Sequence, residues 1–219
     1  MLITSLLLAT TNAFACEKKT EKSKCVQVLV YDNEGKAVSD MVVYLQPLAG
    51  QKLPVSNEIV TISQQKQAFS PNVSVSQLGN KVNFENKDDI THHIYSVSSK
   101  DKFAFKVQAE TAHISEPFKH EAEIAMGCNI HDWMSGSLLV VDTPYFGKTD
   151  KNGKIDFSIE VLGQYQIIVW HPQLPLDQHR VKQDHDILND ATFNFILPKK
   201  LDPIPTQSND DSFDFVSDY

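Results

Sequence analysis

Basic residues and long apolar runs are both in short supply in this sequence. Its 219 residues include 20 Lys and Arg against 28 Asp and Glu, which gives a formal net charge of −8. Affinity for nucleic acid comes largely from basic side chains that neutralise phosphates, so this balance excludes a nucleic-acid binder. Beyond residue 15, no stretch approaches the roughly 20 apolar residues of a membrane-spanning helix. We therefore expect neither a nucleic-acid partner nor a transmembrane segment.

The first residues have the pattern of an export signal. Residues 2–15 are apolar apart from Thr, Ser and Asn, and the run ends in Ala13-Phe14-Ala15, which is typical of an A-x-A cleavage site. No Lys or Arg precedes the run, although signal peptides usually have one. We expect residues 1–15 to be a signal peptide cleaved after Ala15 and the mature protein to be periplasmic or secreted. A lipoprotein modified at Cys16 is the alternative.

Cysteine is scarce, with three residues, and each needs an explanation in an oxidising compartment. Cys16 and Cys25 flank a short segment rich in Lys and Glu. They form either a disulfide or two loosely constrained thiols, and the sequence leaves both open. Cys128 is then left over. An unpaired thiol in an exported protein is oxidised unless something occupies the sulfur, and a metal ion is the obvious candidate.

Helical periodicity is also missing, whereas apolar and polar residues alternate in several short runs. These runs centre on residues 26–30, 82–84, 122–126 and 165–169, and turn sequences at 32–35, 78–80 and 150–153 separate them. Short alternating runs at such spacing predict an all-β sandwich or barrel. The polar, acidic residues 200–219 have no periodicity and are predicted to be a disordered tail.

Two segments far apart in the chain look like halves of one small domain. Residues 26–48 read strand, D-N-E-G-K turn, strand, and residues 149–172 read T-D-K-N-G-K, strand, G-Q-Y, strand. Placed end to end, they resemble the carboxypeptidase regulatory-like (transthyretin-like) β-sandwich. The resemblance implies that residues 25–55 and 143–199 form a split sandwich into which residues 56–142 are inserted. A string of unrelated β-hairpins is the alternative.

The residues with the clearest chemistry follow the run at 122–126. The segment C-N-I-H-D-W-M places Cys128, His131 and Met134 at C-x2-H-x2-M, and the pair His92-His93 opens another β-run upstream. A thiolate, two imidazoles and a weakly bound thioether are the ligands of a mononuclear type 1 copper centre. A loop this short brings three ligands to one metal, and the strands at its ends hold them in position.

A copper site has three alternatives in this segment. A structural zinc site needs four N, S or carboxylate ligands, and methionine is a poor one. A Cys–His nucleophile pair needs a third group that orients the imidazole. The third alternative is coincidence, because His and Met are common enough for the C-x2-H-x2-M spacing to arise by chance. No nucleophile elbow or Ser-His-Asp pattern occurs elsewhere, and the chain has no H-x-H pair, which multicopper oxidases need. We therefore do not expect an enzyme.

Residues 71–95 and the C-N-I-H-D-W-M loop together resemble the cupredoxin family. The first segment has a proline-led strand, a V-x-x-G-x-x-V-x-F-like strand, an N-x-D loop and a histidine followed two residues later by Ile94; the second resembles the amicyanin-type ligand loop. The chain as a whole is similar to the bacterial cupredoxin-like (amicyanin- and plastocyanin-like) proteins often labelled methylamine utilization proteins. The resemblance implies a cupredoxin Greek-key β-sandwich over residues 56–142. It also implies one type 1 copper per chain, bound by four ligands: His92, Cys128, His131 and Met134.

The histidine ligand upstream is ambiguous because most cupredoxins have His-Asn where this sequence has His92-His93. Adjacent side chains in a strand face opposite ways, so only one of the two can point at the metal. Ile94 corresponds to the valine two residues after the family's ligand, which favours His92 over His93.

The resemblance implies an exported blue copper protein that carries single electrons. Electrons would pass through the edge of His131, and Ile130 and Trp133 would form an apolar rim for a redox partner protein such as a c-type cytochrome or a quinoprotein dehydrogenase. A periplasmic copper-binding or copper-handling protein without a fixed redox partner is the alternative. A β-sandwich adhesion module that keeps the copper loop incidentally is a third.

Overall fold

A computed structural model describes residues 16, 19–98 and 100–207 of the chain. The proposed signal peptide, residues 1–15, and residues 208–219 of the predicted tail lie outside this part. Within it the chain is all-β, as the alternating runs predicted, with one short 3-10 helix (η1, Asp177–His179) and no α-helix. The strands are β1 (Lys24–Tyr31), β2 (Val42–Pro47), β3 (Val60–Gln65), β4 (Ala68–Ser70), β5 (Val73–Gln77), β6 (Val82–Asn86), β7 (His92–Ser96), β8 (Ala104–Val107), β9 (Ala112–Ile114), β10 (Ala122–Cys128), β11 (His131–Val141), β12 (Phe146–Lys148), β13 (Lys154–Ile159), β14 (Gly163–Trp170), β15 (Arg180–Ile187) and β16 (Ala191–Ile196).

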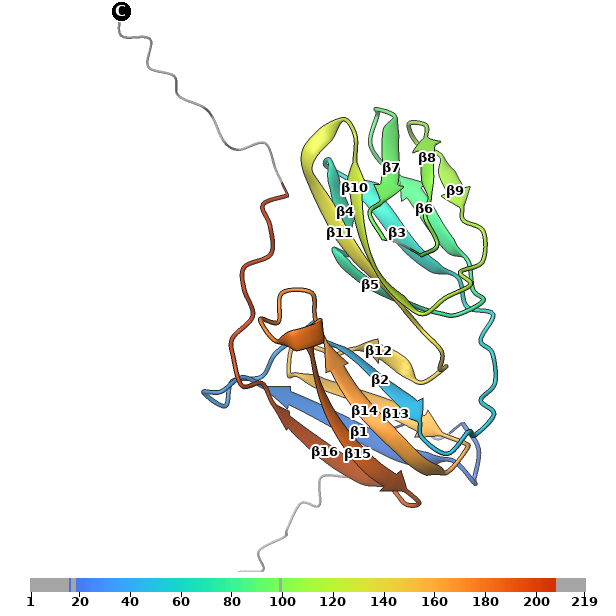
Figure 1. Ribbon diagram of the computed structural model, residues 1–219, viewed down its shortest axis with the longest axis vertical. Coiled ribbons are helices and arrows are strands. Elements are labelled where there is room, and N and C mark those ends of the chain that lie inside the picture. Colours follow the sequence, from blue (N-terminus) through green and yellow to red (C-terminus); the bar gives the residue numbers. More distant parts are fainter. Residues whose placement is uncertain (1–15, 17–18, 99, 208–219) are drawn as a thin grey trace, which may run out of the picture.

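The middle of the chain forms one β-sandwich, drawn in colours from cyan through green to yellow in Figure 1. A five-stranded sheet in the order β5-β11-β10-β7-β8 faces a four-stranded sheet in the order β4-β3-β6-β9. Every second side chain of these strands points inward, and the core between the sheets includes Ile62, Phe84, Ile94, Ile124 and Leu138. The sandwich expected over this part of the chain is therefore present.

The two ends of the chain meet in a second sandwich. Its sheets have the orders β13-β1-β16 and β12-β2-β14-β15, so each sheet contains a central strand from before residue 48 and neighbours from after residue 145. Its core includes Val28, Val43, Ile167 and Phe195. This pairing supports our proposal that residues 25–55 and 143–199 form one split domain around residues 56–142.

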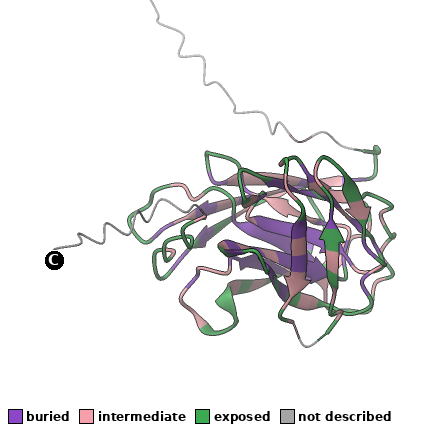
Figure 2. Cartoon of the chain, turned by 90° about the horizontal axis from the view of Figure 1, so that it is seen from above, coloured by how far each residue is buried: buried purple, intermediate pink, exposed green. Residues whose placement is uncertain are grey.

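The two sandwiches pack together through strands that are apolar on both faces. In β11, Leu138 and Val140 lie in the core of the first sandwich, whereas Leu139 and Val141 face the second. Strands β2 and β14 have the same two-sided pattern. The resulting interface contains Val42, Tyr44, Val73, Val75, Leu139, Val141, Ile168 and Trp170, all at most 7% exposed. Figure 2, a view of the chain from above, shows buried strand segments in purple and exposed loops in green.

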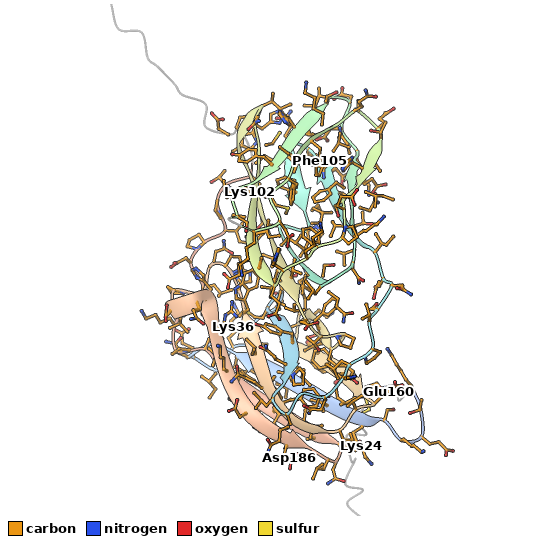
Figure 3. All side chains as sticks on the ribbon, turned by 45° about the vertical axis from the view of Figure 1, so that its right-hand side comes forward. Lys24, Lys36, Lys102, Phe105, Glu160 and Asp186 are labelled. Carbon is orange, nitrogen blue, oxygen red and sulfur yellow. A yellow bond between two sulfur atoms is a disulfide. The ribbon has the colours of Figure 1, made fainter. Side chains whose placement is uncertain are left out.

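Polar contacts add to the apolar interface between the sandwiches. Arg180 of β15 forms an ion pair with Glu123 of β10 and donates a hydrogen bond to the Tyr44 hydroxyl at 3.0 Å. Lys36 and Lys102, which are labelled in Figure 3, are exposed. In the described part, no helix is long and apolar enough to cross a membrane.

The segment after β16 runs from one sandwich to the other, alongside β11 (Figure 1). Leu201 packs against the core of the split sandwich, and the Asp202 N–H donates to the Gln173 carbonyl at 2.8 Å. Farther on, the Gln207 side chain accepts a hydrogen bond from the Ser135 N–H at 3.3 Å and donates one to its hydroxyl at 3.0 Å. Residues 201–207, the first part of the predicted tail, are placed by these contacts.

The N-terminal cysteines are paired. Cys16 and Cys25 form a disulfide with their Cα atoms 5.8 Å apart, so of the two arrangements left open by the sequence the structure has the disulfide. Cys25 lies in β1, and the bond ties the first described residue to the central strand of the sheet β13-β1-β16. Cys128 is a free, buried cysteine.

Candidate metal centre

A tight hairpin brings the two ligand candidates of the C-x2-H motif together. Cys128 ends β10 and His131 begins β11, and the two residues between them, Asn129 and Ile130, form the turn. Cys128 and His131 are directly paired across the hairpin. A two-residue loop joins antiparallel strands in this way, so the spacing in the sequence becomes two facing side chains.

A register shift next to the hairpin leaves Met134 without a partner in β10. Gly127 pairs with Ser135 while its neighbour Cys128 pairs with His131, so residues 132–134 have no partners in β10. Such bulges redirect side chains. Met134 is 1% exposed and belongs to the same apolar core cluster as Cys128.

Gly127 itself is needed at this point for space. A Cβ atom there would lie 2.8 Å from the ring of Tyr95 on β7, closer than side chains tolerate. Any larger residue would therefore displace either Tyr95 or the strand that carries Cys128.

The upstream histidine comes from β7, which lies beside β10 in the sheet. Ile94 is opposite Cys128, and His92 points to the same side of β7 as Ile94, into the sandwich. His92 is fully buried, whereas His93 is partly exposed and has its Nδ1 3.2 Å from the Asn129 amide nitrogen. The structure thus brings His92, and not His93, to Cys128.

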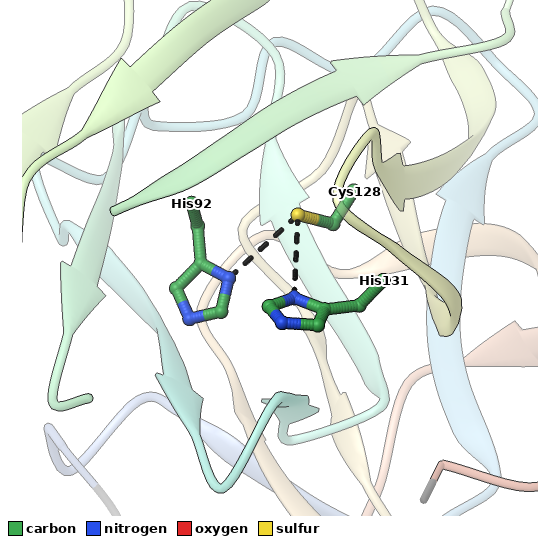
Figure 4. A group of neighbouring side chains, drawn as sticks. All are labelled: His92, Cys128 and His131. Atoms are coloured by element: carbon green, nitrogen blue, oxygen red, sulfur yellow. Dashed lines mark hydrogen bonds between the residues drawn. The ribbon is translucent and has the colours of Figure 1, made fainter. Parts of the chain in front are cut away.

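Three donor atoms converge at this end of the sandwich (Figure 4). The Sγ of Cys128 lies 3.6 Å from Nδ1 of His92 and 3.9 Å from Nδ1 of His131. For an ion at the centre of a trigonal site, metal–nitrogen and metal–sulfur bonds of about 2.0 and 2.3 Å place nitrogen and sulfur about 3.7 Å apart. The spacing therefore fits one metal ion between the three side chains. No other group of this kind occurs among the described residues.

The electrostatic surroundings of His131 also fit a metal site. Burial and the neighbouring His92 lower the pKa of His131 against the opposing charge of Asp88, and a lower pKa favours the neutral ring that binds a metal. The Nε2 of His92 lies 2.9 Å from a carboxylate oxygen of Asp88, a residue that the sequence analysis did not assign to the site. The N-x-D motif four residues before the histidine was the signal available for it.

One edge of the site lies near the surface. His131 is 9% exposed, and its neighbour in the turn, Ile130, is 54% exposed. The ring of Trp133 lies beside His131, with the centroids 5.2 Å apart. The hairpin therefore surrounds one imidazole with apolar side chains at the end of the sandwich.

Substituting the adjacent histidines tests which of them is the ligand. We expect His92→Ala to remove an imidazole from the donor set, so that added copper gives no stable thiolate-to-copper charge-transfer band. His93→Ala, the matched control, should keep the band because this ring lies outside the donor group. Visible absorption and copper content of the two purified variants measure the difference. The opposite result would move the ligand by one residue.

Comparisons with known proteins find no matching protein family and no matching curated protein. Among solved structures, an oxidised amicyanin variant is 15% identical, with coverage of 37% of this chain and 81% of its own and a TM-score of 0.35. A reduced Cu(I) form of another amicyanin variant is 16% identical, with coverage of 40% and 86% and a TM-score of 0.35. The Cu-containing nitrite reductase of Thermus scotoductus SA-01 is 23% identical, with coverage of 44% of this chain and 25% of the reductase and a TM-score of 0.37. These similarities are too low to assign a function, and membership of the cupredoxin family remains our prediction.

Proposed function

We propose that this protein is an exported type 1 copper protein of the cupredoxin kind that carries one electron at a time. The observation that supports it most is the group of His92, Cys128 and His131, whose donor atoms lie within 4.8 Å of one another inside a sandwich core. With Met134 as a weak fourth ligand, the group would hold one copper ion per chain.

The donor types favour copper over zinc. The group contains one thiol and two imidazoles and no carboxylate. Structural zinc sites are completed by a further Cys, His or carboxylate, whereas the remaining residue of this motif is the thioether of Met134. Two imidazoles and a thiolate with a weak thioether suit copper.

The way the ligands are held favours electron transfer. A bound copper ion supplies a centre that alternates between Cu(I) and Cu(II). Cys128 and His131 are fixed by a two-residue hairpin, and His92 belongs to the adjacent strand, with Cys128 and Met134 packed in the apolar core. Ligands held this firmly keep their positions in both oxidation states, which lowers the cost of moving an electron.

The exposed edge of the site gives a place for a partner protein. Ile130, the residue before His131, is exposed, and the ring of Trp133 lies beside the His131 ring, which is 9% exposed. Small, apolar patches of this kind suit the brief encounters of redox proteins. We propose a redox protein such as a c-type cytochrome or a quinoprotein dehydrogenase as the partner.

The cysteines support export. Cys16 and Cys25 are joined in a disulfide, which persists in oxidising compartments. A lipoprotein anchor would require the Cys16 sulfur to carry a lipid, and the disulfide already uses this sulfur. We therefore propose cleavage after Ala15 and a periplasmic or secreted mature protein.

Spectroscopic and redox measurements on the copper-loaded protein test this function. We expect one copper per chain, an intense blue colour when oxidised, reversible one-electron reduction, and fast electron exchange between oxidised and reduced molecules. Copper content, visible absorption, voltammetry and NMR line broadening measure these properties. Slow exchange together with transfer of the copper to a competing chelator would contradict a carrier and indicate copper handling instead.

A further inference from the structure

We infer that Asp88 is a positioning residue of the copper centre. Asp88 selects the ring nitrogen that His92 offers to the metal, and it lowers the reduction potential of the site. The inference rests on the proposed function. The Asp88 carboxylate has hydrogen bonds to His92 and to the backbone of Lys66 and Gln67, and none to Cys128 or His131.

The contact between Asp88 and His92 determines which nitrogen is free. Oδ2 of Asp88 lies 2.9 Å from Nε2 of His92, and the His92 side chain is 0% exposed while that of Asp88 is 12% exposed. A carboxylate accepts hydrogen bonds, so Nε2 carries the proton and donates it. Nδ1, 3.6 Å from the Cys128 sulfur, is then the nitrogen with a free lone pair. The carboxylate thus selects the tautomer that metal binding requires.

The surroundings of Asp88 fit a carboxylate rather than a neutral acid or an amide. The backbone N–H of Lys66 donates to Oδ1 at 2.6 Å, and that of Gln67 donates to Oδ2 at 2.9 Å. Together with Nε2 of His92, all three partners are N–H groups. Lys66 and Gln67 form the two-residue turn between β3 and β4, with φ of 55° and 57°, a left-handed geometry that turns both amides toward Asp88.

The loop that carries Asp88 is held independently of any metal. Nδ2 of Asn86, which is 2% exposed, donates to the carbonyl oxygens of Ile90, Val107 and Gln108 at 2.7–3.1 Å. Its Oδ1 accepts the Asp88 N–H at 3.0 Å. The loop between β6 and β7 is therefore closed by one buried amide, and Asp88 reaches His92 from a fixed position.

The chemical consequence is a preference between the oxidation states. A carboxylate bonded to the far nitrogen of a ligand imidazole makes the ring a stronger donor and adds a negative charge near the metal. Both effects stabilise the ion of higher charge, Cu(II), relative to Cu(I). The reduction potential is therefore lower than it would be with a neutral acceptor in this position.

The test compares two substitutions in one loop. In Asp88→Asn, the amide oxygen is still able to accept from His92 and Gln67, but the charge is lost. We expect the blue band to remain and the affinity for Cu(II) to fall about tenfold relative to that for Cu(I), which raises the reduction potential by about 59 mV. Asp89→Asn, the matched control, removes the same charge one residue away, where the side chain is exposed, and should leave the potential nearly unchanged.

A second measurement needs neither copper nor a variant. Nitrogen-15 NMR of the metal-free wild-type protein should find the His92 ring protonated at Nε2 and unprotonated at Nδ1. A proton on Nδ1, or equal potentials in the two Asn variants of a blue protein, would overturn the inference and leave the proposed function standing. A wild-type protein that is not blue with copper would overturn both.

Discussion

Replacement of Cys128 by serine is expected to remove the blue colour completely. The colour of such a centre comes from charge transfer from a thiolate to Cu(II), and a serine hydroxyl cannot take the place of the soft sulfur. Cys128 is the free cysteine of the described chain, 3% exposed, and both imidazoles of the site face its sulfur. No other residue in the group supplies a thiolate, so the loss should be total rather than partial.

Visible absorption and copper content of the purified Cys128→Ser protein measure this effect. Asn129→Ser, in the exposed turn next to it, is the matched control and should stay blue. A serine is slightly smaller than a cysteine, and we expect both variants to melt within a few degrees of the wild type. A blue Cys128→Ser protein would show that the metal ligands have been assigned incorrectly.

A fragment of residues 143–199 alone is expected to be unfolded. β1 lies between β13 and β16, and β2 lies between β12 and β14, so the fragment lacks a central strand from each sheet. It also lacks six buried core side chains: Val26, Val28, Val30, Met41, Val43 and Leu45. Burial of such side chains stabilises by about 1.5–3 kcal/mol each. The sum for six, about 9–18 kcal/mol, is as large as the roughly 5–15 kcal/mol that separate a typical folded domain from its unfolded state.

Circular dichroism during heating measures this prediction. The fragment should give no cooperative transition, whereas a protein in which residues 25–55 are joined to residues 143–199 by a short linker should melt cooperatively. The joined protein exposes the face around Trp170, so gel filtration is needed to establish that it is a monomer. A cooperative transition of the 143–199 fragment as a monomer would contradict the split domain and favour two sequential ones.

The strands and turns of this protein follow from local patterns in the sequence. The alternating runs at 26–30, 82–84 and 122–126 lie in β1, β6 and β10, because alternation of apolar and polar residues matches the two-residue repeat of a strand. The run at 165–169 lies in β14. The turn sequences lie between strands because their Asn and Gly residues favour turns, which is also a local property. A C-x2-H motif at the end of a strand likewise predicts a hairpin with two facing side chains, and the structure has it.

These local patterns did not predict the contacts between segments that are distant in the sequence. Strands β2, β11 and β14 are apolar on both faces, and only the packing of two sandwiches explains why Val42, Leu139 and Trp170 are buried. The apolar pattern of one strand does not show whether its second apolar face is buried or exposed, because the strands that cover this face lie about a hundred residues away in the sequence.

The site divides in the same way between sequence and tertiary structure. The residue types and spacing of Cys128, His131 and Met134 are local, and they were enough to predict a copper site. Whether His92 or His93 faces the sulfur depends on how β7 pairs with β10, and the contact of Asp88 with His92 depends on the turn at Lys66 from another sheet. The sequence by itself determined which ligands are available and where the chain turns. The tertiary structure decided which side chains meet, because register and packing are set by contacts between segments that are remote along the chain.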